Sequence, residues 1–109
     1  MNIIVVDSGV NKSHKIFKQD NIIILSLQYI DGNITRSNED NDLFGHGTAI
    51  SGIISRCNAD IKITVIGISD LADGLDEETL ILVLNYINEN LEADIINLSL
   101  GINICEKYN

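Results

Sequence analysis

Two side chains in the first half of the chain are suited to acid–base chemistry together. The segment FGHGT at positions 44–48 places His46 where a polar loop ends and residues with helical apolar spacing begin. The positive end of a helix dipole favours the neutral imidazole ring, which is the form that a general base needs. A base also needs a group that orients it, and Asp7 is the best candidate.

The position of Asp7 follows from the run that precedes it. Residues 3–6 read IIVV, which is too short for a helix and typical of a buried parallel strand. Asp7 then lies at the carboxyl end of that strand, where open α/β sheets place their chemistry. Aspartate before a Ser-Gly pair also caps turns, so the sequence alone leaves both roles open.

The rest of the chain alternates strands and helices. Apolar runs at 21–27, 60–66 and 94–100 predict three more strands, and helical spacing predicts helices over 48–57 and 76–92. Residues 11–20 indicate a loop or short helical turn. This order predicts an α/β fold, a doubly wound parallel sheet with flanking helices.

A polar stretch over residues 31–44 predicts a long loop that leads to His46. Three of its acidic residues, Glu39, Asp40 and Asp42, are typical of a solvated tip. They could also bind a hard cation such as Ca²⁺, although their spacing matches no known loop for this ion. We therefore expect no cofactor and keep calcium as the alternative.

Composition limits the possible partners. The chain has 109 residues, 45% of them hydrophobic, and a formal net charge of −9, which predicts one globular domain at most. Nucleic acids and anionic membranes need a basic face, so we expect neither as a partner. Without a membrane-spanning run or signal peptide, the expected location is cytoplasmic, with Cys57 and Cys105 as free, buried thiols.

Three segments resemble the subtilisin-like serine peptidases (subtilases), and together they cover almost the whole chain. VVDSGV at 5–10 is similar to that family's aspartate motif, and HGTAISG at 46–52 is similar to its histidine motif. DIINLSLG at 94–101 is similar to the strand that leads to its substrate-binding wall. The resemblance implies that residues 1–109 are the N-terminal part of a single subtilisin-like peptidase domain, incomplete without a C-terminal portion.

The resemblance also implies a role for each matching position. Asp7 would orient His46, and His46 would take the proton of the nucleophile and return it to the leaving amine. The substrate-binding residues would be Ser99, Leu100 and Gly101, which line the pocket, and Gly74, at an edge that pairs with extended substrate.

The family's Gly-Thr-Ser nucleophile motif does not occur within these 109 residues. The resemblance therefore implies that a Ser-bearing segment or second chain completes the triad before a peptide or protein substrate is hydrolysed. In its absence, strand 94–100 or another sheet edge should expose apolar surface.

Two other functions remain open. The chain could be a non-catalytic, truncated subtilase relative that binds a peptide or protein partner. It could also be an unrelated flavodoxin-like or receiver-type signalling domain, with Asp7 in an acidic cluster at the sheet's carboxyl end.

Overall fold

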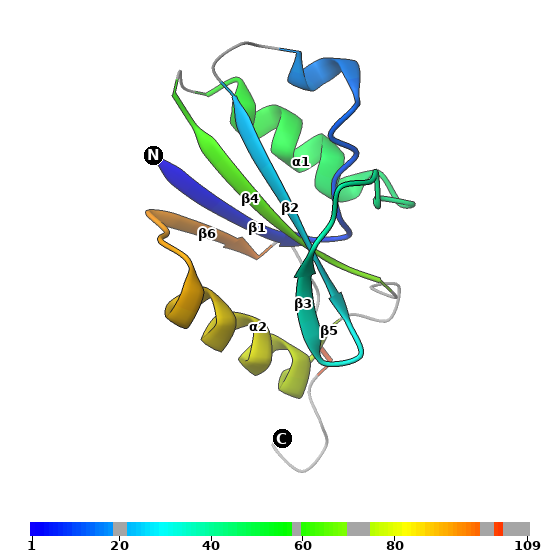
Figure 1. Cartoon of the computed structure of the whole chain (residues 1–109), viewed down its shortest axis with the longest axis vertical. Helices are drawn as coiled ribbons and strands as arrows, with labels where there is room; N and C mark the ends of the chain where they lie inside the picture. Colours follow the sequence, from blue (N-terminus) through cyan, green and yellow to red (C-terminus); the bar gives the residue numbers. More distant parts are fainter. Residues whose placement is uncertain (19–21, 58–59, 70–74, 99–101, 104–109) are drawn as a thin grey trace.

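The computed structural model describes residues 1–18, 22–57, 60–69, 75–98 and 102–103. Over these residues it is an α/β structure with a mixed five-stranded sheet, a small parallel two-stranded sheet and two α-helices (Figure 1). The elements in chain order are β1 (Asn2–Asp7), the 3-10 helix η1 (Lys15–Phe17), β2 (Ile23–Ile30), β3 (Asn33–Arg36), α1 (His46–Ser55), β4 (Lys62–Ile68), β5 (Leu75–Asp76), α2 (Glu77–Asn90), β6 (Ile95–Leu98) and β7 (Ile102–Asn103).

The main sheet has the strand order β3-β2-β4-β1-β6. β2, β4, β1 and β6 are parallel, as predicted, but β3 runs antiparallel to β2. The prediction that 31–44 is all loop and the sheet all parallel is therefore wrong. The cause is the pair Asp31-Gly32, whose φ angles of 49° and 84° make a two-residue hairpin turn.

The two helices cover opposite faces of the sheet (Figure 1). Each face of the sheet has its own hydrophobic core. Alternate residues of β1 belong to different cores, because Ile3 and Val5 pack on the α1 side while Ile4 and Val6 pack on the α2 side. α2 is capped by Asp76, whose side chain accepts a hydrogen bond from the Thr79 amide at 2.7 Å, as its sequence predicted.

Helix α1 packs through its small residues. The residues that it buries are Gly47, Thr48, Ser51, Gly52 and Ser55. The apolar spacing predicted the helix correctly, but Ala49 and Ile53 are exposed, and so is Cys57 just beyond its end, against the prediction of a buried thiol. Small side chains let the helix backbone lie close to the sheet and to the loop after β1.

Strand β6 forms one edge of the sheet and pairs with β1. Its residues Ile95, Ile96 and Leu98 are 49%, 41% and 42% exposed, respectively. Successive strand residues point to opposite faces, so apolar surface is open on both sides of this edge. This is the exposed edge that the sequence predicted. No helix in the described ranges is both long and apolar enough to cross a membrane.

Candidate functional site

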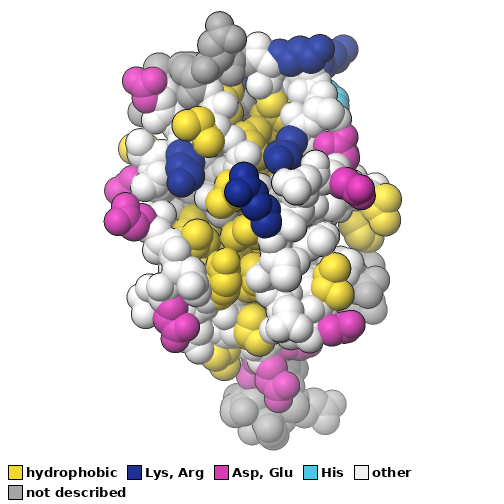
Figure 2. Space-filling view, in the orientation of Figure 1, with side chains coloured by type: hydrophobic (Ala, Val, Ile, Leu, Met, Phe, Trp, Pro, Cys, Tyr) yellow, Lys and Arg dark blue, Asp and Glu magenta, His cyan; other side chains and the backbone are white. Residues whose placement is uncertain are grey.

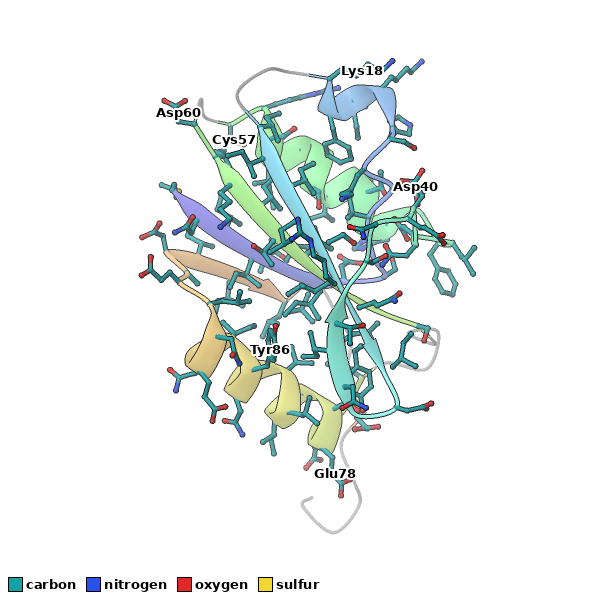
Figure 3. The ribbon with its side chains drawn as sticks, viewed as in Figure 1. Lys18, Asp40, Cys57, Asp60, Glu78 and Tyr86 are labelled. Atoms are coloured by element: carbon teal, nitrogen blue, oxygen red, sulfur yellow. The ribbon has the colours of Figure 1, made fainter. Side chains whose placement is uncertain are left out.

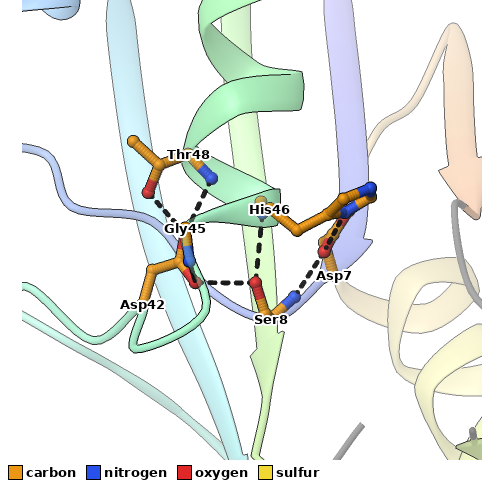
Figure 4. A network of polar contacts seen from close by, with 7 residues as sticks. Asp7, Ser8, Asp42, Gly45, His46 and Thr48 are labelled. Atoms are coloured by element: carbon orange, nitrogen blue, oxygen red, sulfur yellow. Dashed lines mark hydrogen bonds and ion pairs between the residues drawn. The ribbon is translucent and has the colours of Figure 1, made fainter. Parts of the chain in front are cut away.

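Asp7 and His46 meet at the carboxyl edge of the sheet. Asp7 is the last residue of β1 and His46 is the first residue of α1. The Nδ1 atom of His46 lies 2.9 Å from both Oδ1 and Oδ2 of Asp7 (Figure 4). The fold thus brings together two residues that are 39 positions apart in the chain.

The two members of the pair differ in exposure. Asp7 is 1% exposed, whereas the His46 side chain is 55% exposed. Asp7 Oδ1 also accepts a hydrogen bond from the Ser8 amide at 2.7 Å. The carboxylate is therefore held by a ring on one side and by backbone on the other, while much of the imidazole faces solvent.

This geometry determines which ring nitrogen is available for chemistry. A carboxylate accepts hydrogen bonds, so Asp7 favours the tautomer of His46 that carries its proton on Nδ1. Nε2 is then left with a free lone pair on the part of the ring away from Asp7. A histidine in this state can accept a proton from a nucleophile or from water.

A second aspartate, Asp42, fixes the loop that leads to His46. Its Oδ1 accepts hydrogen bonds from Ser8 Oγ at 2.6 Å and from the Gly45 amide at 2.9 Å (Figure 4). Its Oδ2 accepts from the Thr48 amide at 2.9 Å and from Thr48 Oγ1 at 2.5 Å. Ser8 Oγ in turn accepts from the Gly47 amide at 3.1 Å. Asp42 thereby ties the turn after β1 to the first turn of α1.

The environment of Asp42 favours its charged form. Burial is the largest single influence and raises the pKa of this carboxyl, which is 6% exposed. The hydrogen bonds from Ser8, Thr48 and Gly45 together outweigh burial and hold the pKa of Asp42 below its ordinary value of 3.8. Asp42 is therefore an ionised anchor at neutral pH.

Close backbone contact also positions His46. A Cβ on Gly47 would lie 2.0 Å from the Gly9 carbonyl oxygen, and a Cβ on Gly67 would lie 2.8 Å from the Gly9 Cα. Gly45, just before the helix, has a φ of 82°, which other residues rarely adopt. Glycine is thus needed on both sides of the histidine.

The other predicted site residues lie outside the described residues. This applies to all four substrate-binding positions: Gly74, Ser99, Leu100 and Gly101. Of the predicted site residues, the structure describes only Asp7 and His46, and it brings these two into contact.

Two acidic side chains of the loop make hydrogen bonds within the described part of the chain. No group of three or more His, Cys, Asp or Glu side chains there could hold a metal ion. Asp42 uses both oxygens on protein donors, and Asp40 accepts hydrogen bonds from the amide and hydroxyl of Ser13.

Sequence reasoning missed the role of Asp42. It treated this residue as part of an acidic tip, whereas its carboxylate caps the N-terminal turn of α1 through Gly45 and Thr48. The sequence held no local signal for this role, because a capping side chain normally comes from the residue directly before the helix, and that residue is Gly45.

The chain matches no protein-family model, no curated protein and no solved structure.

Proposed function

We propose that the chain is the Asp- and His-bearing part of a subtilisin-like serine endopeptidase. It would hydrolyse peptide bonds once a Ser-bearing segment or second chain completes the triad. The observation that carries this proposal is the contact of His46 Nδ1 with both oxygens of buried Asp7, with the ring largely exposed. A buried carboxylate behind an outward-facing imidazole is the arrangement that a Ser-His-Asp mechanism requires.

Each residue would have a defined task in that mechanism. His46 Nε2 would accept the proton of the serine hydroxyl as its oxygen attacks the substrate carbonyl, and would then give the proton to the leaving amine. Asp7 would stay ionised, hold the ring in place and stabilise the imidazolium. Asp42 and Gly47 would fix the helix start from which His46 projects.

Three of the described serines are poorly placed to act as the nucleophile. Ser8 Oγ is engaged with Asp42 and the Gly47 amide, and the buried hydroxyls of Ser26 and Ser51 have no hydrogen-bond partner in the described part of the chain. Ser26 and Ser51 are fully buried, so neither can meet a substrate. The apolar edge at β6 offers a surface on which a completing part of the sheet could pair.

Labelling with a fluorophosphonate, which reacts with activated serines, tests the proposal. The chain is combined with a Ser-bearing polypeptide. This polypeptide is encoded either further along the same reading frame or by a neighbouring gene with a Gly-Thr-Ser motif. The isolated chain should remain unlabelled, and the Ser-bearing part should be labelled in the complex. His46→Ala should abolish labelling, and Asp7→Asn should slow catalysis by about 10⁴-fold, because the amide favours the wrong tautomer.

His14→Ala is the matched control. His14 is exposed, and its Nδ1 accepts a hydrogen bond from the Ile16 amide, so it takes no part in the Asp7 and His46 contact. The variant should leave labelling unchanged. Labelling that persists in His46→Ala would remove His46 from its assigned role. If no Ser-bearing part restores labelling to the unmodified chain, the peptidase proposal fails.

The alternative is a non-catalytic chain that binds a peptide or protein partner. It would show binding without labelling in any combination of chains. A receiver-type domain is disfavoured by a specific observation, because Asp7 is 1% exposed and both of its oxygens face His46. Acyl-phosphate formation at Asp7, followed with acetyl phosphate, should therefore be absent.

A further inference from the structure

Helix α2 covers only part of its face of the main sheet (Figure 1). The uncovered part carries the half-buried Leu25, two exposed isoleucines and two exposed cations, and we call it the open face: Ile23, Leu25, Arg36, Lys62 and Ile96. The strand register places them together. Lys62 lies opposite Ile23, Arg36 lies opposite Leu27, and Ile96 lies opposite Ile4, and directly paired residues share a face. Figure 2 shows lysine and arginine side chains gathered over hydrophobic ones on this side of the molecule.

The outer side of α2 has the opposite charge. Its residues at helical spacing border a shallow hollow of about 430 Å³, and we call them the outer stripe: Glu78, Ile81, Leu82, Asn85, Tyr86 and Glu89. Ile81 is 58% exposed, Glu78 (labelled in Figure 3) is the first residue of the stripe, and Glu89 is the last. The buried side of the helix is formed by Thr79, Val83 and Ile87, so most of the stripe faces away from the sheet, while Tyr86 at its border packs against the core beneath α2.

The charges on the two surfaces have similar spacing. Glu78 and Glu89 are 11 residues apart, which is about 16 Å along a helix. Arg36 and Lys62 lie on strands that are two strand spacings apart. Their partners on β2, Leu27 and Ile23, are four positions apart along the strand. The two offsets together give a separation of about 16 Å across the sheet. Asp94 lies at the border of the open face, where its carboxylate accepts a hydrogen bond from the Asn2 amide.

From this match we infer that the open face binds the outer stripe of α2 from a second copy of the chain. Both surfaces are on the same side of the molecule, so one two-fold axis allows each copy to place its α2 on the other's open face. The apolar residues of each stripe would pack on those of the open face, with Glu78 and Glu89 paired to Arg36 and Lys62. Such pairs select the partner and its orientation more than they add affinity.

Analytical ultracentrifugation of the 109-residue chain tests this inference. The unmodified chain should form a dimer that weakens as salt is raised from about 0.05 M to about 0.5 M. The double variant Arg36→Glu/Lys62→Glu and the double variant Glu78→Lys/Glu89→Lys should each raise the dimer dissociation constant at least about tenfold. A mixture of the two should dimerise again, since each contact then joins opposite charges.

The control is Lys15→Glu/Lys18→Glu, which changes the net charge equally at exposed positions on and beside η1. It should dimerise like the unmodified chain and should not rescue the Glu78→Lys/Glu89→Lys variant. Restored dimers in the mixture also demonstrate that both variants are folded. A monomeric unmodified chain at about 1 mM, or a mixture that stays monomeric, would overturn the inference.

Discussion

Asp42 holds the histidine loop in place through its charge, so its effect depends on pH. A carboxyl whose pKa is lowered on folding stabilises the folded state above its ordinary value, here 3.8. That contribution is lost as the pH falls through the lowered folded-state pKa. The same residue therefore links the position of His46 to acid stability.

We expect Asp42→Asn to lower the free energy of unfolding by about 2 kcal/mol at pH 6, because an amide cannot accept all four hydrogen bonds. Urea unfolding at several pH values measures this difference. As the pH falls from about 5 toward acid unfolding, the unmodified chain should lose more stability than the variant. Plots of the free energy of unfolding against pH for the two chains should therefore converge. Parallel curves would mean that Asp42 is not the ionised anchor.

At this scale the sequence predicted the Asp7 and His46 pair and missed Asp42. A histidine between two glycines at a helix start and an aspartate at a strand end are local signals. The bonds from Ser8 and Thr48 to Asp42 join residues that are 34 and 6 positions away, and only the folded structure shows which acidic residue of the loop receives them.

At the scale of elements, the position of α1 depends on the close approach of its backbone to the loop after β1, at Gly47 and Gly9. Apolar spacing predicted where the helix lies, but its buried side consists of glycine, serine and threonine. β3 was missed because a short polar strand without alternation gives no periodic signal, although Asp31-Gly32 marks the turn. Strands β1, β2, β4 and β6 were predictable because each is a β-branched or leucine-rich run.

Two glycines of α1 provide a matched pair of substitutions. Gly47→Ala should destabilise the chain by about 3 kcal/mol, because the new Cβ would lie 2.0 Å from the Gly9 carbonyl oxygen. Gly52→Ala should change stability by no more than about 1 kcal/mol, because its Cβ would meet the end of the flexible Ile16 side chain and alanine favours the helix. Thermal unfolding monitored by circular dichroism compares the two, and equal effects would contradict the close approach at Gly9.

At the scale of the whole molecule, the sheet has one apolar edge at β6 that the described chain leaves unpaired. A hollow of about 340 Å³ adjoins it on the α1 side, lined by Met1, Ile3, Ile54, Cys57, Ile61, Ile95 and Asn97. Sequence reasoning predicted this exposed edge from the resemblance. Nothing in the sequence indicated the charge match between the open face and α2, because it depends on the register of three strands.

Ile95→Lys tests whether the β6 edge is needed to complete the triad, because it should reduce labelling in the complex while leaving the stability of the chain nearly unchanged. The side chain is 49% exposed, so we expect the free energy of unfolding to change by no more than about 1 kcal/mol. Fluorophosphonate labelling in the complex with the Ser-bearing part should fall at least about tenfold, because a charge would be buried at the pairing edge. Ile30→Lys, 51% exposed at the end of β2, is the control and should label normally.

The Asp7 and His46 contact also has a consequence for the rate of assembly. Because the imidazole is already held by Asp7, and its loop by Asp42, in the unassembled chain, a completing part has no need to order the base as it docks. Completion would then be a rigid-body encounter, with an association rate set by diffusion and surface charge. A net charge of −9 would make that encounter fastest for a cationic partner at low ionic strength.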